Sequence, residues 1–169
     1  MNALLRTLNR LSSFLERGAT IFASSSLILM TVCVLIQIVA RYIFSEPPAW
    51  TEELARHAMI WSGFSGATAA YSRRADPVLV NYANFKRAWM RQCAQFIEII
   101  AVFLFSGAVL LAAPAFMTLH RDMLTETLQA PLQIVIAIIP LSMAVLAFHA
   151  AVRLLTLIFH GRSVSESAK

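Results

Sequence analysis

The sequence predicts an all-α integral membrane protein with four transmembrane helices and both ends of the chain on the cytoplasmic side. Of its 169 residues, 59% are hydrophobic and only 14% are charged, whereas soluble domains contain about 25% charged residues. The apolar residues gather in four stretches, each close to the roughly 20 residues that a spanning helix needs. Basic residues gather in the segments on one side of these stretches. We therefore expect one membrane domain over residues 1–169.

The first span is expected at about residues 19–43, which is too long for the core of a signal peptide. Before it, leucines recur every three or four residues while arginines point elsewhere. This pattern predicts a basic amphipathic helix over residues 1–17 that lies in the headgroup layer. A continuous extension of the first span is the alternative, and Gly18 is where a break is expected.

The second span is expected at about residues 51–71, after Pro47 and Pro48 end the first helix. Thr51 is the expected N-cap of this helix. It is the least apolar of the four, and a stripe of small residues runs along it. Small residues every four positions let helices approach closely inside a membrane, so we expect protein around this helix. The stripe is Ser62, Gly66 and Ala70.

The third and fourth spans are expected at about residues 92–117 and 131–159. A basic loop precedes the third span, and the middle of this loop, residues 78–89, is apolar enough to lie on the membrane surface. Pro114 is expected to bend the third helix near its outer end, and Pro140 lies inside the fourth.

Basic residues set the orientation of the chain, because short cytoplasmic loops carry an excess of Lys and Arg. Only Arg41 and Arg121 fall on the outer side, which predicts that the N- and C-termini are both inside. It also explains the basic composition without a nucleic-acid partner. The inner side holds eleven basic residues: Arg6, Arg10, Arg17, Arg73, Arg74, Lys86, Arg87, Arg91, Arg153, Arg162 and Lys169.

Two groups of polar residues are candidate sites. The first stands at the outer end of the second span, where Glu52 and Arg56, and likewise Glu53 and His57, have the four-residue spacing of helical ion pairs. It is either a capped helix end, with Trp50 as an interfacial anchor, or a contact surface for another subunit. The two interpretations are compatible, because intramembrane charges usually face protein or water.

The second candidate is Glu98, about two turns inside the third span. Arg153 and His149 lie at matching depth on the fourth span, so a buried ion pair is expected. Snorkelling to the interface and a role in proton or ion transport are the alternatives.

Catalytic, cofactor-binding and metal-binding arrangements are not expected. Cys33 and Cys93 have no paired spacing, and the sequence contains no phosphate loop or nucleophile elbow. Haem between paired histidines is disfavoured because His57 and His149 would differ in depth by roughly 20 Å. We therefore expect that the chain is not an enzyme and that it binds no cofactor.

Several segments resemble a known family, the DctQ-type small membrane subunit of tripartite ATP-independent periplasmic (TRAP) transporters. Residues 50–56, Trp-Thr-Glu-Glu-Leu-Ala-Arg, are similar to the family's Trp-(Ser/Thr)-Glu-Glu-Leu-Ala-Arg signature. Arg41 begins an Arg-Tyr-Ile-Phe string that closes the first span, and Pro131 and Pro140 match two proline-marked positions of the fourth helix. The sequence departs from the family pattern after Arg73-Arg74, where Ala75-Asp76-Pro77 stands, so the resemblance names no substrate.

The resemblance implies a non-catalytic subunit of the bacterial inner membrane. Its partners would be a large, sodium-coupled elevator subunit of the DctM type, which this chain would anchor, and a periplasmic binding protein that delivers an organic acid. The residues expected to take part in assembly are Arg41, Trp50, Glu52, Glu53, Arg56, Ser62, Gly66 and Ala70. The alternative function is a stand-alone homodimeric exporter, for which Glu98 is the one candidate carboxylate within the membrane.

Overall fold

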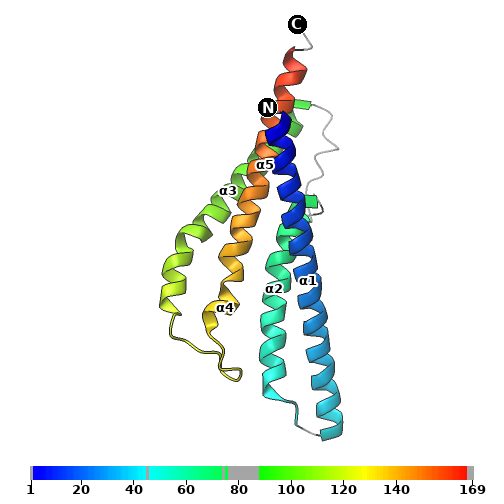
Figure 1. Cartoon of the computed structure of the whole chain (residues 1–169), viewed down its shortest axis with the longest axis vertical. Helices are drawn as coiled ribbons and strands as arrows, with labels where there is room; N and C mark the ends of the chain where they lie inside the picture. The colour runs from blue at the N-terminus through cyan, green and yellow to red at the C-terminus, as the bar shows by residue number, and fades with distance from the viewer. Residues whose placement is uncertain (1, 45, 74, 76–87, 167–169) are drawn as a thin grey trace.

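The computed structural model describes residues 2–44, 46–73, 75 and 88–166 as an all-helical chain, which confirms that the fold is all-α. The helices are α1 (Asn2–Phe44), α2 (Ala49–Arg73), α3 (Ala88–Leu119), the short α4 (Leu132–Ile136) and α5 (Ile138–Glu166) (Figure 1). The predicted surface segment of residues 78–89 falls almost wholly in the stretch 76–87, outside the described residues.

Three of the described helical segments are long and apolar enough to cross a membrane: Arg6–Ile43, Trp89–Leu119 and Leu132–Ile158. The helix α2 is not among them. It has 25 residues, which suffices for a span, but it carries Glu52, Glu53 and Arg56 near its start and many small or hydroxylated residues after them. The second predicted span is therefore present as a helix, without the apolar surface of the other three.

The helix α1 is continuous over 43 residues, so the expected break at Gly18 was wrong and the alternative, an extension of the first span, is correct. Glycine inside a helix costs only about 1 kcal/mol. Side-chain bonds on both sides of Gly18 offset that cost: Ser12 contacts His149 of α5, and Glu16 and Thr20 both contact Arg73 of α2.

The predicted start of α2 also differs from the structure. The helix begins at Ala49, and Thr51 is fully buried within its first turn. The Thr51 hydroxyl donates to the Pro48 carbonyl at 2.6 Å, and so does the Thr51 N–H at 3.1 Å. Pro48 and Thr51 thus form a compact turn, and the hydroxyl serves that turn rather than a helix cap.

A break separates α4 from α5 at Ala137. Pro140 has no N–H to donate to the carbonyl four residues earlier, and its ring crowds that carbonyl. The chain continues as helix beyond this point, because the N–H of Ala137 bonds to Gln133 at 2.9 Å and that of Leu141 to Ala137 at 3.2 Å. The fourth predicted span therefore consists of two helical pieces.

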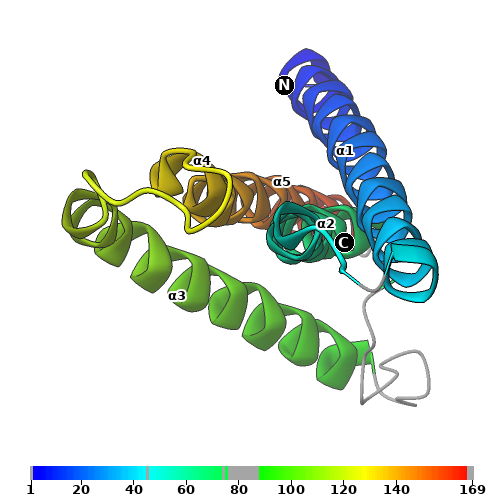
Figure 2. The same cartoon turned by 90° about the horizontal axis from the view of Figure 1, so that it is seen from below.

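The helices contact one another in the order α1, α2, α5 and α3, because α2 packs against both α1 and α5, and α3 packs against α5. Figure 2 shows this open arrangement end-on, with α2 and α5 between α1 and α3. The start of α1 and the end of α5 lie at the same end of the molecule (Figure 1). The buried core sits near this end, around Tyr71, Ile99 and Ala150.

Candidate functional site

Glu53 joins the start of α2 to the loop between α3 and α4. Its carboxylate oxygen Oε2 accepts the backbone N–H of Thr127 at 2.6 Å and that of Leu128 at 3.1 Å. The loop itself is closed by bonds between Thr125 and Ala130: the N–H of Thr125 donates to the Ala130 carbonyl at 2.9 Å, and the N–H of Ala130 donates to the Thr125 hydroxyl at 3.1 Å. The carboxylate thus fixes the α3–α4 loop relative to the α1–α2 pair.

The other residues of the first candidate site are exposed or pack within the chain. Arg56 donates to Glu52 at 2.7 Å, and both side chains are about two-thirds exposed, at 65% and 67%. The sequence spacing also suggested a pair between Glu53 and His57, but the structure turns Glu53 to the loop and places the His57 ring 6.4 Å from that of Trp61. Arg41 and Trp50 are exposed.

Trp61 ties three helices together in the middle of α2. Its indole N–H donates to the backbone carbonyl of Val135 in α4 at 3.2 Å, and its ring lies 6.3 Å from that of Phe22 in α1. The break before Pro140 makes this contact available, because the carbonyls of a regular helix are taken by its own N–H groups. Trp61 therefore locks the position of the broken helix against α1 and α2.

Glu98 and Arg153 form a two-bonded ion pair between α3 and α5. The guanidinium atoms Nη1 and Nη2 donate to Oε1 at 2.5 Å and to Oε2 at 3.0 Å, and the side chains are only 12% (Arg153) and 20% (Glu98) exposed. The Arg153 guanidinium also stands 5.4 Å from the ring centroid of Tyr71 in α2. The charge of Glu98 is thus compensated within the chain, because each carboxylate oxygen accepts a hydrogen bond from the guanidinium group.

His149 takes no part in that ion pair. It is 3% exposed, and its Nδ1 lies 2.8 Å from the hydroxyl of Ser12 in α1. Four residues further along α1, Glu16 accepts from Nε of Arg73 at 2.5 Å, and Arg73 also donates to Thr20 at 3.0 Å. Two polar contacts therefore hold the N-terminal half of α1 against α5 and α2.

Sequence reasoning missed this second set of contacts, made by Ser12, Glu16, Thr20 and Arg73. One signal pointed to it: Glu16 is the only acidic residue before Glu46, in a segment otherwise rich in arginine. It lies one turn from Ser12, on the face that packs against the other helices. A lone acid on the packed face of a basic helix is a candidate for an interhelical ion pair.

One face of α2 remains open. Its exposed residues are spaced by three or four positions, so they form a single stripe along the helix. Gly63 lies near the middle of α2, and a methyl group added there would meet nothing within 4 Å. The predicted stripe of Ser62, Gly66 and Ala70 is half-buried, and Gly66 stands close to Ala23 of α1. The open stripe consists of Glu52, Arg56, Met59, Gly63 and Ala67.

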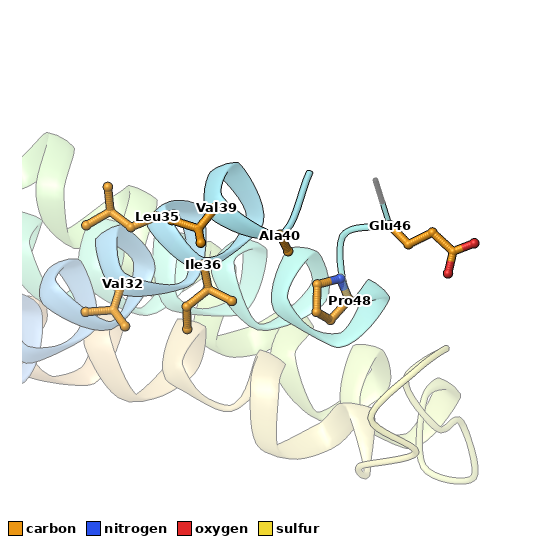
Figure 3. Close-up of a pocket in the computed structure, with 7 residues that line it drawn as sticks. All are labelled: Val32, Leu35, Ile36, Val39, Ala40, Glu46 and Pro48. Atoms are coloured by element: carbon orange, nitrogen blue, oxygen red, sulfur yellow. The ribbon is translucent and has the colours of Figure 1, made fainter. Parts of the chain in front are cut away.

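An open groove of about 560 Å³ runs along the C-terminal half of α1 (Figure 3). Only one of its lining residues is charged, and Figure 3 shows this residue, Glu46, directed away from the apolar side chains. The groove therefore suits hydrocarbon better than a charged substrate. Its lining residues are Val32, Leu35, Ile36, Val39, Ala40, Glu46 and Pro48.

Most of the polar side chains described above thus make hydrogen bonds or ion pairs to other helices or to the α3–α4 loop. Within the described part of the chain, no three His, Cys, Asp or Glu side chains gather in a group that could hold a metal ion. Glu98 and Arg153, which are only 20% and 12% exposed, are paired with each other. Chemically, the arrangement can fix helices and loops, and its open stripe on α2 can receive another surface.

Comparison with known proteins identifies the same family along most of the chain. The family model described as "Tripartite ATP-independent periplasmic transporters, DctQ component" matches residues 30–160. A TRAP transporter small permease protein of Haemophilus influenzae is 35% identical over 74 residues. This alignment covers 42% of the chain and 46% of the relative, so it spans less than half of either protein.

Proposed function

Because the chain belongs to the DctQ component family of the tripartite ATP-independent periplasmic transporters, we propose that it is the small, non-catalytic permease subunit that anchors a large membrane subunit. It is a multi-pass inner-membrane protein and a transporter component, not an enzyme. The large DctM-type subunit would carry an organic acid, coupled to sodium, and a periplasmic binding protein would deliver that acid. The substrate and the coupling ion in this proposal rest on the family alone.

The proposed topology has four spans, with α2 as the fourth and with both termini in the cytoplasm. Its length supports this, since 25 residues of helix extend for about 37 Å, beyond the roughly 30 Å hydrocarbon core. The eleven-to-two distribution of basic residues supports the orientation. Reporter fusions would test it: a fusion after Arg73 should report a cytoplasmic position and a fusion at Arg121 a periplasmic one.

The open stripe of α2 is the observation that carries the assembly proposal. On α1, the exposed outer half is lined by large aliphatic side chains such as Leu35 and Val39, which suit lipid. The α2 stripe instead presents Gly63, Ala67 and the exposed Arg56–Glu52 pair. Small residues favour close packing of helices in membranes, and polar residues there usually face protein. We therefore assign this stripe to the large subunit.

The ion pair between Glu98 and Arg153 favours a structural role for this chain over transport by the chain itself. A substrate-binding carboxylate must be able to exchange its partner for the substrate. Glu98 gives both of its oxygens to Arg153 at the packed junction of α3 and α5, and it does not line the groove on α1. No feature of the described structure favours the alternative, a stand-alone exporter.

The outer face is proposed to receive the periplasmic binding protein. The loop that Glu53 fixes has two hydrogen bonds to that carboxylate and a tight turn at Gln129, whose φ is 51°. The loop and the α1–α2 turn lie at the same end of the molecule (Figure 1). A loop held in one conformation loses less entropy when a partner docks on it.

Substitution of Gly63 by Leu tests the assembly proposal. The full chain would be co-expressed with a large TRAP subunit of the DctM type, and recovery of that subunit would be measured after purification in a mild detergent. We expect Gly63→Leu to reduce recovery by about ten-fold or more, since a bulky side chain blocks close helix packing. The chain itself should keep its stability, because nothing lies within 4 Å of the added carbon.

Gly107→Leu on α3 is the matched control, because a carbon added there also meets nothing within 4 Å. It should leave recovery of the large subunit unchanged. Equal recovery with Gly63→Leu and wild type would remove the stripe from the interface. A wild-type chain that transports a substrate by itself, with no partner, would overturn the proposed function.

A further inference from the structure

The N-terminal half of α1 extends beyond the membrane core. The apolar run of this helix is bracketed by Arg17 and Arg41, which are 24 residues or about 36 Å apart. That distance matches a hydrocarbon core of about 30 Å plus part of the headgroup layers. Arg17 therefore marks one membrane edge, and the residues before it stand at or outside the level of the headgroups.

Three arginines share one side of this extension. Arg6, Arg10 and Arg17 are four and seven residues apart, which places them within about 40° of one another around the helix. All three are exposed. Ser12 and Glu16 lie about 140° and 100° around the helix from the middle of this side, and they are bonded to α5 and α2. The basic stripe, defined as Arg6, Arg10 and Arg17, therefore faces away from the bundle.

No acidic side chain neutralises the basic stripe within the described part of the chain. Glu16 is the only acid on this segment, and Arg73 of α2 takes it at 2.5 Å. Large apolar side chains flank the stripe instead: Phe14 is 73% exposed and Ile21 is 68% exposed. A helix face that combines arginines with exposed aromatic and aliphatic residues is typical of contact with a membrane surface.

We propose that the basic stripe of α1 binds the phosphates of anionic phospholipids in the adjacent leaflet. Arg17 lies at the edge of the core, and Arg10 lies about 10 Å further along the helix, which is about one Debye length at 0.1 M salt. Figure 2 shows α1 running obliquely along one side of the bundle, and an oblique helix holds these residues nearer to the membrane plane than an upright one. The arginines supply the charge and the bonds to phosphate, while Phe14 supplies the apolar contact.

The expected effect follows from the electrostatics of anionic surfaces, at which each basic residue contributes on the order of a five-fold change in affinity. Loss of Arg10 and Arg17 together should weaken binding by roughly ten- to thirty-fold. Arg6, about 16 Å beyond Arg17, should contribute less, since screening grows with distance.

Lipid titration of the purified full chain tests this proposal. Short-chain phosphatidylglycerol or phosphatidylcholine would be added to the protein in a neutral detergent, and bound lipid would be counted by native mass spectrometry. We expect wild type to prefer phosphatidylglycerol and the Arg10→Gln/Arg17→Gln variant to lose that preference. The Arg10→Lys/Arg17→Lys variant should retain most of it, because the positive charge remains.

The matched control is Arg41→Gln/Arg121→Gln, which removes two exposed positive charges from the other end of the molecule. It should change phosphatidylglycerol binding by less than about three-fold. Equal losses in the two double variants would overturn the proposal, since binding would then follow net charge alone. A wild-type chain without preference for phosphatidylglycerol would also overturn it and would leave the stripe to an acidic protein. Circular dichroism should show unchanged helix content in every variant, because these arginines make no bond to a described acid.

Discussion

Removing Arg153 should destabilise the chain far more than removing an arginine of the same chemistry from its surface. Arg153→Met keeps the apolar length of the side chain but leaves the Glu98 carboxylate, 20% exposed, without its two bonds. Breaking one partner of a buried ion pair costs about 3–5 kcal/mol. The contact with Tyr71 at 5.4 Å adds about 0.5–1 kcal/mol. Because the pair is partly exposed, we expect a loss of about 2–4 kcal/mol.

The second half of the experiment is a double-mutant cycle with Glu98→Gln. The double variant carries no unpaired charge, so it should recover about 1.5–3 kcal/mol relative to the sum of the single losses. Unfolding of the chain in mixed micelles, followed by circular dichroism, would measure each free energy. The surface control is Arg56→Met with Glu52→Gln, an exposed pair on one helix, for which about 0.3–0.5 kcal/mol is expected.

Two results would refute the reasoning. If Arg153→Met cost no more than Arg56→Met, the inner ion pair would contribute no more than a surface contact. If the two inner losses simply added, the bonds between Glu98 and Arg153 would not couple the helices α3 and α5, and their stability would come from the apolar core around Ile99.

Three further predictions follow from single contacts. Trp61→Phe removes the 3.2 Å bond to the Val135 carbonyl and should cost about 1 kcal/mol, whereas Phe22→Leu, which keeps that bond, should cost less if the bond is what matters. Glu53→Gln should raise the rate of hydrogen exchange at the amides of Thr127 and Leu128 while leaving the amides of α3 unchanged. Unaltered exchange would show that the carboxylate does not hold the loop. Ser12→Ala leaves His149, 3% exposed, without its 2.8 Å partner and should cost about 1–3 kcal/mol, against a few tenths for the exposed Ser13→Ala.

Helix positions were the most predictable part of this fold, since apolar runs of the right length can only be helices in a membrane. Two prolines marked the turn after α1, and Pro140 marked the irregularity in the fourth span. The predicted break at Gly18 was wrong because a glycine lowers helix stability only locally. The contacts of Ser12 and Glu16, which keep α1 straight, join residues more than 50 positions apart and leave no local trace.

The depth of a residue along a helix can be predicted from the sequence, but the direction in which its side chain faces is much harder to predict. Counting residues from the membrane edges placed Glu98 and Arg153 at one level, and the structure brings them together. The same count placed His149 there, yet it lies one turn away and faces Ser12. Glu53 and His57 have the spacing of a helical pair, and the loop at Thr127 competes successfully for the carboxylate. Tertiary partners decide such cases, because backbone N–H groups at a tight turn are stronger ligands for a carboxylate than a distant imidazole.

The open stripe of α2 shows what composition can and cannot reveal about partners. Its low apolarity and its small residues indicated a helix surrounded by protein, and α1 and α5 supply part of that protein. They cover Ala58, Ser65 and Ala69, and they leave Gly63 and Ala67 exposed. A helix that is too polar for lipid and only partly covered by its own chain requires a further surface at the same depth. We therefore propose that the small residues that meet the partner are centred on Gly63 rather than on Gly66, which lies about 60° away around the helix.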